Sequence, residues 1–192
     1  YNNHYSIKIT QGVFMKMFTL ILLFVLSASS LSAFSFNGLY SGMMLEHVLE
    51  SNPLANRNFQ SDSCSDTCRD LYYTEEILGA TAKVTLHFTL SNKVLYRVEV
   101  FWSSGVKDED MQKFTDELTA YLDKKYGEIK VGTSTNYNEY VTFKEKKWQP
   151  EPNTEIVARK GLSSLTLILT DIELKSNHDF EMSQHIKKKN KE

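Results

Sequence analysis

The sequence predicts an α+β fold: a two-layer sandwich with one antiparallel sheet of about five strands, a long helix packed on one face, and a short N-terminal helix. Three observations predict it. Residues 80–102 alternate between apolar and polar side chains on either side of a short polar break, which is typical of a half-buried β-hairpin. Residues 108–127 repeat apolar side chains every three or four positions, as an amphipathic helix does. Residues 139–174 alternate again in three runs, which favours an antiparallel meander.

The chain begins with segments that we exclude from the fold. Residues 1–14 are interpreted as upstream sequence and residues 15–35 as a secretory signal peptide. Lys16 supplies the charged start of this signal, residues 17–26 are an apolar run, and residues 27–33 are mostly small. The pattern predicts export, to the periplasm of a bacterium or to the medium.

Two cleavage positions fit this signal. Small residues at Ala33 and Ser35 predict cleavage before Phe36, and cleavage after Ala33 is the alternative. An uncleaved signal anchor is a further alternative, because residues 18–36 are nearly free of charge. After cleavage we expect no stable membrane span.

The remaining chain has the size and charge of one ordinary domain. Removing residues 1–35 leaves about 157 residues, enough for one core, which we assign to residues 36–177, with a basic tail over residues 178–192. Residues 1–35 hold two lysines and no acidic residue, so the remainder carries 20 basic and 24 acidic residues. This negative balance argues against general binding of nucleic acid.

Cys64 and Cys68 are the two cysteines of the chain. In an exported protein we expect them to form a disulfide, although a loop this small gains little entropic stabilisation. We expect no metal site, because no histidine is close in sequence and the neighbouring aspartates lack the spacing of a calcium loop. The polar segment 54–70 that contains the pair is either a functional loop, and then one of two candidate binding surfaces, or an insertion that the disulfide protects from proteolysis.

Residues 36–53 predict one short helix that ends at Asn52 and Pro53. The pattern G-x-x-x-G-M-x-L-E-x-V, from Gly38 to Val48, resembles the opening of small envelope domains such as the BamE-like fold. The resemblance spans about a dozen residues, and a long hairpin then departs from that fold, so no function is carried over. His47 on this helix is a candidate acid–base residue, but a histidine at the edge of an amphipathic helix is more often structural.

The register of the hairpin follows from its apolar residues. Residues 71–78 lead into it, either as an extension of the strand or as a helical turn. The apolar side chains of the first strand are the even-numbered residues of 84–90, and those of the second strand are the even-numbered residues of 94–102. Both sets lie on the same side of the hairpin only if the loop between the strands holds an odd number of residues, as the loop 91–93 does. Such a loop places its last residue, Lys93, in a left-handed conformation. The expected pairs are Leu90 with Val94, Phe88 with Tyr96, and Leu86 with Val98.

The other side of the hairpin is mixed in character. It carries Lys83, Thr85, His87, Thr89, Leu95, Arg97, Glu99 and Phe101. In the predicted register His87 lies opposite Arg97, and Glu99 lies diagonal to His87, so His87, Arg97 and Glu99 form the candidate binding face. The same residues would tune a histidine for general base catalysis in an enzyme. Charge pairing across a wet sheet is the simpler interpretation.

The long helix begins at Asp108, has Lys124 and Lys125 in its last turn, and ends at Gly127. Its apolar stripe is Met111, Phe114, Leu118, Tyr121 and Leu122. We expect this stripe to pack on the apolar side of the hairpin.

After a predicted loop over residues 128–138, three strands are expected over residues 139–148, 154–159 and 162–174. The basic tail then holds four lysines near its end and favours at most a last helical turn. These lysines suit contact with anionic lipid or lipopolysaccharide, although a solvated terminus is the simpler interpretation.

The sequence favours a non-enzymatic binding or envelope-associated module with a protein partner and no cofactor. It contains no set of nucleophile and base, no metal-ligating cluster and no phosphate-binding loop. Two alternatives stay open. One is a secreted hydrolase that uses His87 and Glu99, with His47 as a further candidate; the other is a secreted inhibitor that presents the Cys64–Cys68 loop. The oligomeric state is left open.

Overall fold

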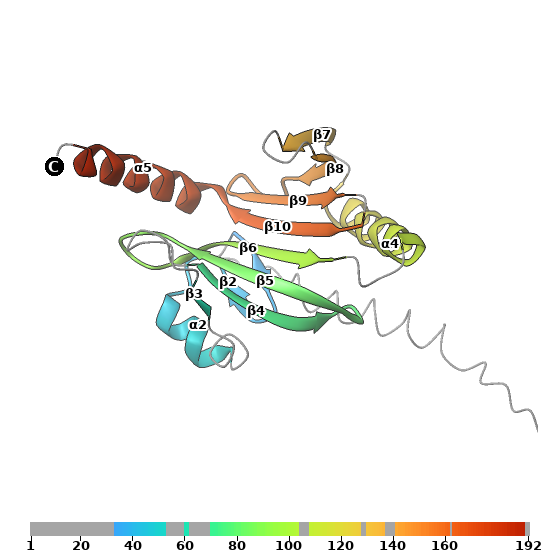
Figure 1. Cartoon of the computed structure of the whole chain (residues 1–192), viewed down its shortest axis with the longest axis horizontal. Helices are drawn as coiled ribbons and strands as arrows, with labels where there is room; N and C mark the ends of the chain where they lie inside the picture. The colour runs from blue at the N-terminus through green and yellow to red at the C-terminus, as the bar shows by residue number, and fades with distance from the viewer. Residues whose placement is uncertain are drawn as a thin grey trace, which may run out of the picture.

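The computed structural model has an α+β fold, which confirms the predicted class (Figure 1). It describes residues 33–52, 60–61, 70–103, 108–127, 130–136, 141–161 and 163–190. The predicted signal peptide up to residue 32 and the Cys64–Cys68 pair lie outside these residues. Among the helices described, none is long and apolar enough to cross a membrane.

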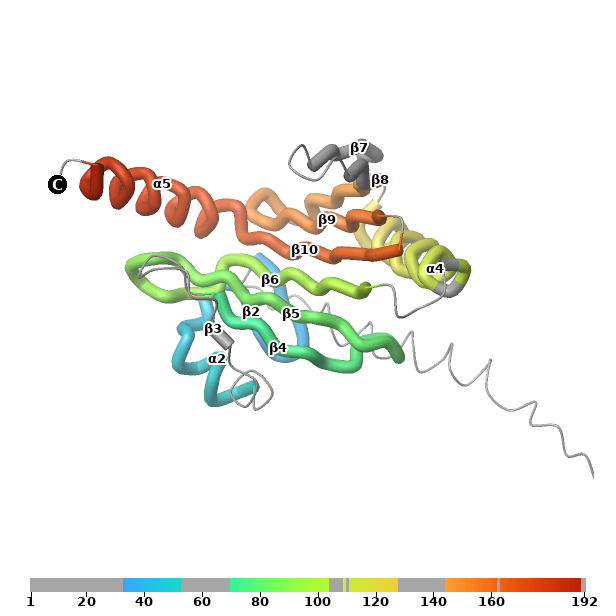
Figure 2. The backbone as a smooth tube through the Cα atoms, in the orientation of Figure 1, coloured from blue at the N-terminus to red at the C-terminus, as the bar shows by residue number. Residues whose placement is uncertain are grey.

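A large antiparallel sheet forms the body of the molecule. Its strand order is β3-β4-β5-β6-β10-β9-β8-β7. The strands are β3 (Gln60–Ser61), β4 (Asp70–Ile77), β5 (Ala80–Phe88), β6 (Leu95–Trp102), β7 (Lys130–Asn136), β8 (Val141–Trp148), β9 (Thr154–Lys160) and β10 (Leu165–Asp171). The path of the backbone in Figure 2 shows the second half of the chain folding back so that β10 pairs with β6.

The sheet has three strands more than the five predicted: the short β3, which lies in the segment predicted as a loop and pairs with β4, and two longer strands, β4 and β7. Residues 71–78 form a strand, because Leu71, Tyr73 and Ile77 are buried at alternate positions or nearly so while the residues between them are not. Residues 130–136, predicted as a loop, form β7, which pairs along its whole length with β8. This segment has weak apolar alternation, but β8 offers it a full row of main-chain partners at the edge of the sheet.

The two faces of the sheet differ in chemistry, as predicted for the hairpin. We call them the apolar face and the polar face. A row of the apolar face runs Leu71, Leu86, Val98, Leu169, Ile156 and Trp148 from β4 to β8. The neighbouring row of the polar face runs Asp70, His87, Arg97, Thr170 and Glu155 from β4 to β9. Every member of the first row is buried in the core.

A β-bulge corrects part of the predicted register. His87 pairs with Arg97 as expected, but Phe88 pairs with Leu95 and not with Tyr96. Tyr96 is the extra residue, and it exchanges the faces that Leu95 and Tyr96 were predicted to occupy. Leu95 is fully buried in the core, while Tyr96 lies outside the core cluster. The loop still ends on a left-handed residue, because Lys93 has a φ of 53°.

The N-terminal part of the described chain packs against the core. A small two-stranded sheet joins β1 (Ser35–Phe36) to β2 (Leu39–Tyr40) through the turn Asn37-Gly38, and α2 (Leu45–Ser51) follows as the predicted short helix. Phe34 and Phe36 are both buried in the core. Folded structure therefore includes Phe34, which lies before the predicted cleavage site at Phe36 and after the alternative site at Ala33.

Two longer helices complete the fold. The first, α4 (Asp108–Tyr126), packs on the apolar face as predicted: the Phe114 ring meets Trp102 edge-on at 5.2 Å, and Asp123 accepts a 3.0 Å hydrogen bond from the Trp148 indole. The second, α5 (Ile172–Lys189), replaces the predicted end of a strand and a short basic tail. It begins there because the Asp171 side chain accepts a hydrogen bond from the backbone N–H of Leu174, a helix N-cap.

Candidate functional site

The predicted residues His87, Arg97 and Glu99 meet on the polar face, where Asp70 joins them. We call these four residues the His87 cluster. Asp70 is the first residue of β4 and pairs with His87 of β5, and His87 pairs in turn with Arg97 of β6. Glu99 lies two residues beyond Arg97 and therefore on the same face. Alternation along three adjacent strands thus brings two acidic and two basic side chains together.

His87 is held between two carboxylates. Its Nδ1 atom lies 3.0 Å from Asp70 Oδ1, and its Nε2 atom lies 3.5 Å from Glu99 Oε1. The second contact is an ion pair without hydrogen-bond geometry, because Nε2 has no hydrogen-bond partner among the described residues. Glu99 also forms an ion pair with the Arg97 guanidinium.

These contacts shift the charge states of the cluster. Burial alone lowers the pKa of His87, but the carboxylates of Asp70 and Glu99 act against it and raise the pKa above its ordinary value of 6.5. Burial alone raises the pKa of Glu99, but the nearby His87 and Arg97 outweigh this effect and lower the pKa of Glu99 below its ordinary value of 4.5. Both shifts favour the charged forms, so the cluster is a set of mutually neutralising charges.

This geometry is better suited to a structural role than to proton transfer. A general base needs a ring nitrogen that is free to accept a proton from the reacting group. Both nitrogens of His87 face a carboxylate, and the raised pKa keeps them protonated over a wider range of pH. The cluster therefore braces β4, β5 and β6 together on the polar face.

The bulge residue Tyr96 links the cluster to α5. Its ring centroid lies 6.1 Å from that of His87 and 4.9 Å from that of His178, on which it stacks at an interplanar angle of 24°. Burial and the nearby Asp70 carboxylate raise the pKa of Tyr96 to about 12, so its hydroxyl stays protonated at physiological pH. One helical turn further along α5, Glu181 accepts a 3.2 Å hydrogen bond from the backbone N–H of Ser91 in the hairpin loop.

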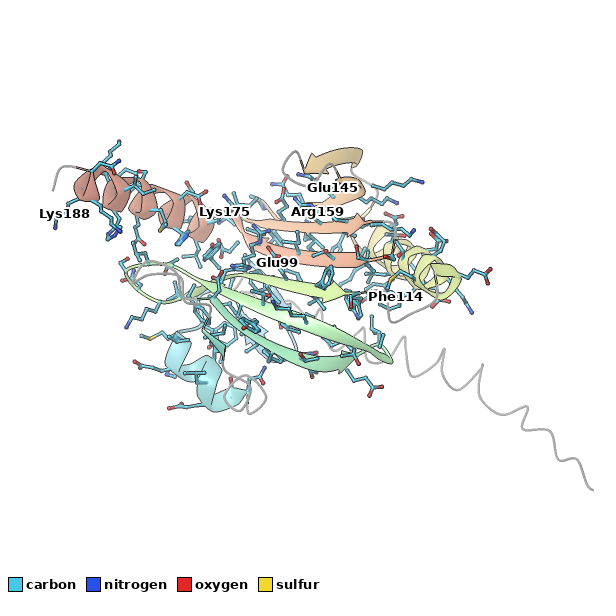
Figure 3. The ribbon with its side chains drawn as sticks, in the orientation of Figure 1. Glu99, Phe114, Glu145, Arg159, Lys175 and Lys188 are labelled. Carbon is cyan, nitrogen blue, oxygen red and sulfur yellow. The ribbon has the colours of Figure 1, made fainter. Side chains whose placement is uncertain are left out.

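A second group of charges lies on the same face, over β8 and β9. Glu145 is buried, with only 7% of its side chain exposed, and its carboxylate lies 2.6 Å from Arg159 Nε and 3.2 Å from Lys147 Nζ. Lys147 also lies 3.7 Å from a Glu155 carboxylate oxygen. Glu99, Glu145 and Arg159 are labelled in Figure 3 and show the spread of these charges over the sheet. The polar face thus carries two groups of paired charges, one over β4, β5 and β6 and the other over β8 and β9.

The other residues singled out in the sequence do not join the cluster. His47 is exposed on α2, whose Val48 is buried in the core on the opposite side of the sheet from His87. Cys64 and Cys68 lie outside the described residues, in the segment that precedes Asp70. Within the described part of the chain, no group of three or more His, Cys, Asp or Glu side chains is placed to hold a metal ion.

Three members of this region were missed by sequence reasoning. Asp70 was assigned to a loop, and its pairing with His87 required the strand β4. Tyr96 was placed on the apolar face because the bulge leaves no mark in the alternation. His178 was assigned to a tail, and only the length of α5 brings it over Tyr96.

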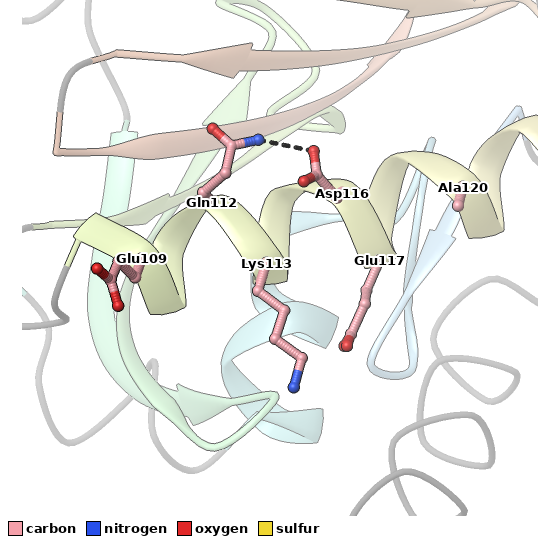
Figure 4. Close-up of a pocket in the computed structure, with 6 residues that line it drawn as sticks. All are labelled: Glu109, Gln112, Lys113, Asp116, Glu117 and Ala120. Carbon is pink, nitrogen blue, oxygen red and sulfur yellow. Dashed lines mark hydrogen bonds between the residues drawn. The ribbon is translucent and has the colours of Figure 1, made fainter.

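An open hollow of about 610 Å³ lies along α4. The described residues that line it are Glu109, Gln112, Lys113, Asp116, Glu117 and Ala120 (Figure 4). All belong to one side of a single helix, and the hydrogen bond drawn joins Gln112 to Asp116 at 2.7 Å. The polar side chains along this hollow do not converge on a common point, so we do not assign it a ligand.

Comparison of the chain with protein-family models, with curated proteins and with solved structures finds no match.

Proposed function

We propose that this chain is an exported, non-enzymatic binding module, and that a protein of the cell envelope docks along α5 and the adjoining part of the polar face. The observation that carries the proposal is the exposure of α5. None of its 18 residues is buried, and it displays Phe180 and Ile186 with 65% and 52% of their surfaces exposed. Together with Ile172 they make up half of the exposed large hydrophobic side chains in the described part of the chain.

The attachment of α5 supports this proposal. A helix of this length is marginally stable in water without tertiary contacts. Its base is held by the Asp171 cap, by the stacking of His178 on Tyr96 and by the contact of Glu181 with Ser91. Its outer side, which carries Phe180, makes no contribution to the core. A helix fixed at its base with an apolar outer side fits a partner that offers an apolar groove.

Export is a separate part of the proposal. The charged, apolar and small-residue segments over residues 15–35 favour it. The burial of Phe34 supports cleavage after Ala33, because cleavage before Phe36 removes a core side chain from the folded domain.

The test is a crosslinking pull-down of the tagged protein from the envelope fraction of the cells that produce it, read by mass spectrometry. We expect one dominant protein partner, with affinity about 30-fold lower for Phe180→Ala if Phe180 is a central contact. Tyr40→Ala is the matched control, because Tyr40 is an exposed aromatic residue on the separate small sheet. A partner that binds Phe180→Ala as tightly as the wild type, or the absence of any partner, refutes the proposal.

A further inference from the structure

We propose that the distal end of α5 is a binding site for the surface of an anionic phospholipid bilayer. This goes beyond the protein partner proposed above, because it concerns the lysines of the last turn, which that proposal does not use; Ile186 is the one residue that the two proposals share. The site is the exposed last turn with Lys187, Lys188 and Lys189, together with the exposed Ile186 beside them.

The first argument is that these lysine charges are not used inside the fold. Within the described residues, Lys175 pairs with Asp179 and Glu181 contacts Ser91, both nearer the base of α5. No ion pair involves Lys187, Lys188 or Lys189 in that part of the chain. Lysines in a last turn also interact favourably with the helix dipole, which accounts for their position but not for an exposed isoleucine next to them.

The second argument is the position of this end. In Figure 1 the helix leaves the end of β10 and extends away from the sheet, and in Figure 3 the labelled Lys188 lies far beyond Lys175. A projecting end reaches a flat surface without a collision between that surface and the body. The chain as a whole carries a net charge of −2, so an anionic surface attracts this end and repels the rest.

The third argument is the type of residue. Lysine is a compact, flexible point charge, whereas the recognition of defined carboxylates on a protein favours the rigid fork of arginine. A lysine cluster beside an apolar side chain suits a fluid surface, in which headgroups neutralise the charges and the isoleucine enters the interface. Each lysine near such a surface contributes about a fivefold gain in affinity, so three contribute on the order of a hundredfold.

The experiment is co-sedimentation of the purified chain with vesicles of phosphatidylcholine, with and without phosphatidylglycerol. The apolar segment 17–26 is common to all variants, so any affinity that it has for lipid cancels in their comparison. We expect Lys187→Gln/Lys188→Gln/Lys189→Gln to bind the anionic vesicles on the order of a hundredfold more weakly than the wild type. Raising the salt from about 0.1 M to about 1 M shortens the screening length from roughly 10 Å to roughly 3 Å and should have a similar effect.

Two further variants make the result specific. Lys113→Gln/Lys124→Gln/Lys144→Gln removes three exposed lysines elsewhere and should bind like the wild type. Ile186→Ala should weaken binding about tenfold, whereas Phe180→Ala should leave it unchanged. Phe180→Ala thereby separates this site from the protein-binding proposal. Circular dichroism of each variant checks that α5 stays helical.

Several outcomes overturn the inference. They are equal binding of the wild type and the first triple variant, equal binding to neutral vesicles, and a loss of binding in the control triple variant. Retention of an acidic protein or a nucleic acid by these lysines, without binding to the vesicles, overturns it as well.

Discussion

The His87 cluster predicts a stability that depends on pH in a defined direction. The folded pKa of His87 is raised above 6.5, so its stabilising contribution is complete below that pH and is lost as the pH rises through the folded pKa. The folded pKa of Glu99 is lowered below 4.5, so its contribution is complete above 4.5 and is lost as the pH falls through the folded pKa. Both contributions are complete between about pH 4.5 and 6.5.

Two substitutions separate these terms. Asp70→Asn keeps a hydrogen-bond acceptor for His87 but removes the charge. Because 37% of the Asp70 side chain is exposed and screened by water, we expect a loss of about 1 kcal/mol in the free energy of unfolding near pH 5.5, and almost none near pH 9. Glu99→Gln should cost about 2 kcal/mol near pH 5.5 and retain part of that cost near pH 9, because Arg97 stays charged.

The assay is urea-induced unfolding followed by tryptophan fluorescence. Trp102 and Trp148 are both buried, so their emission should change on unfolding. In a His87→Gln background, Asp70→Asn should have the same small cost at both pH values. If Asp70→Asn costs as much near pH 9 as near pH 5.5 in the wild-type background, then His87 does not carry the charge that we assign to it and the reasoning is refuted.

Three further predictions follow from other parts of the fold. Lys93→Gly should raise the free energy of unfolding by about 0.5 kcal/mol, since glycine adopts a φ of 53° without strain; a lower urea midpoint would contradict this. Leu118→Ala should lower it by about 2–5 kcal/mol because Leu118 is fully buried in α4, whereas the exposed control Lys124→Ala should change it by less than about 0.5 kcal/mol. Intact mass of the exported protein should place the N-terminus at Phe34; a mass that begins at Phe36 refutes that assignment.

Local patterns predicted the central elements of the fold because each element follows from its own residues. Alternation over residues 80–102 places most of the apolar side chains on one face, and α4 ends at Gly127, which has a φ of 77°. The pair His87–Arg97 followed from the alternation of the two strands together with a three-residue loop over residues 91–93. The β1–β2 turn also had a local signal that sequence reasoning did not use, since Asn37-Gly38 is the typical dipeptide of a two-residue hairpin.

The rest depended on contacts distant in sequence. The alternation places Tyr96 on the apolar side and Leu95 on the other, and only packing against the core decides that Leu95 faces inward. The run of residues 162–174 is apolar across the end of β10, which hides the start of α5 at Asp171. Asp70 acquires a role only through its pairing with His87, and no local pattern specifies that pairing.

The nature of the brace beneath α5 bears on what the helix is for. An apolar underside would bury the hydrophobic residues of α5 in the core and leave a polar exterior. Here the base is held by an N-cap, a stacked Tyr96–His178 pair and a Glu181–Ser91 contact, while the polar face below is occupied by paired charges. These contacts fix the direction of the helix and consume little of its apolar surface. The large apolar side chains Phe180 and Ile186 therefore remain exposed along a helix of fixed direction, which is the arrangement that a recognition surface requires.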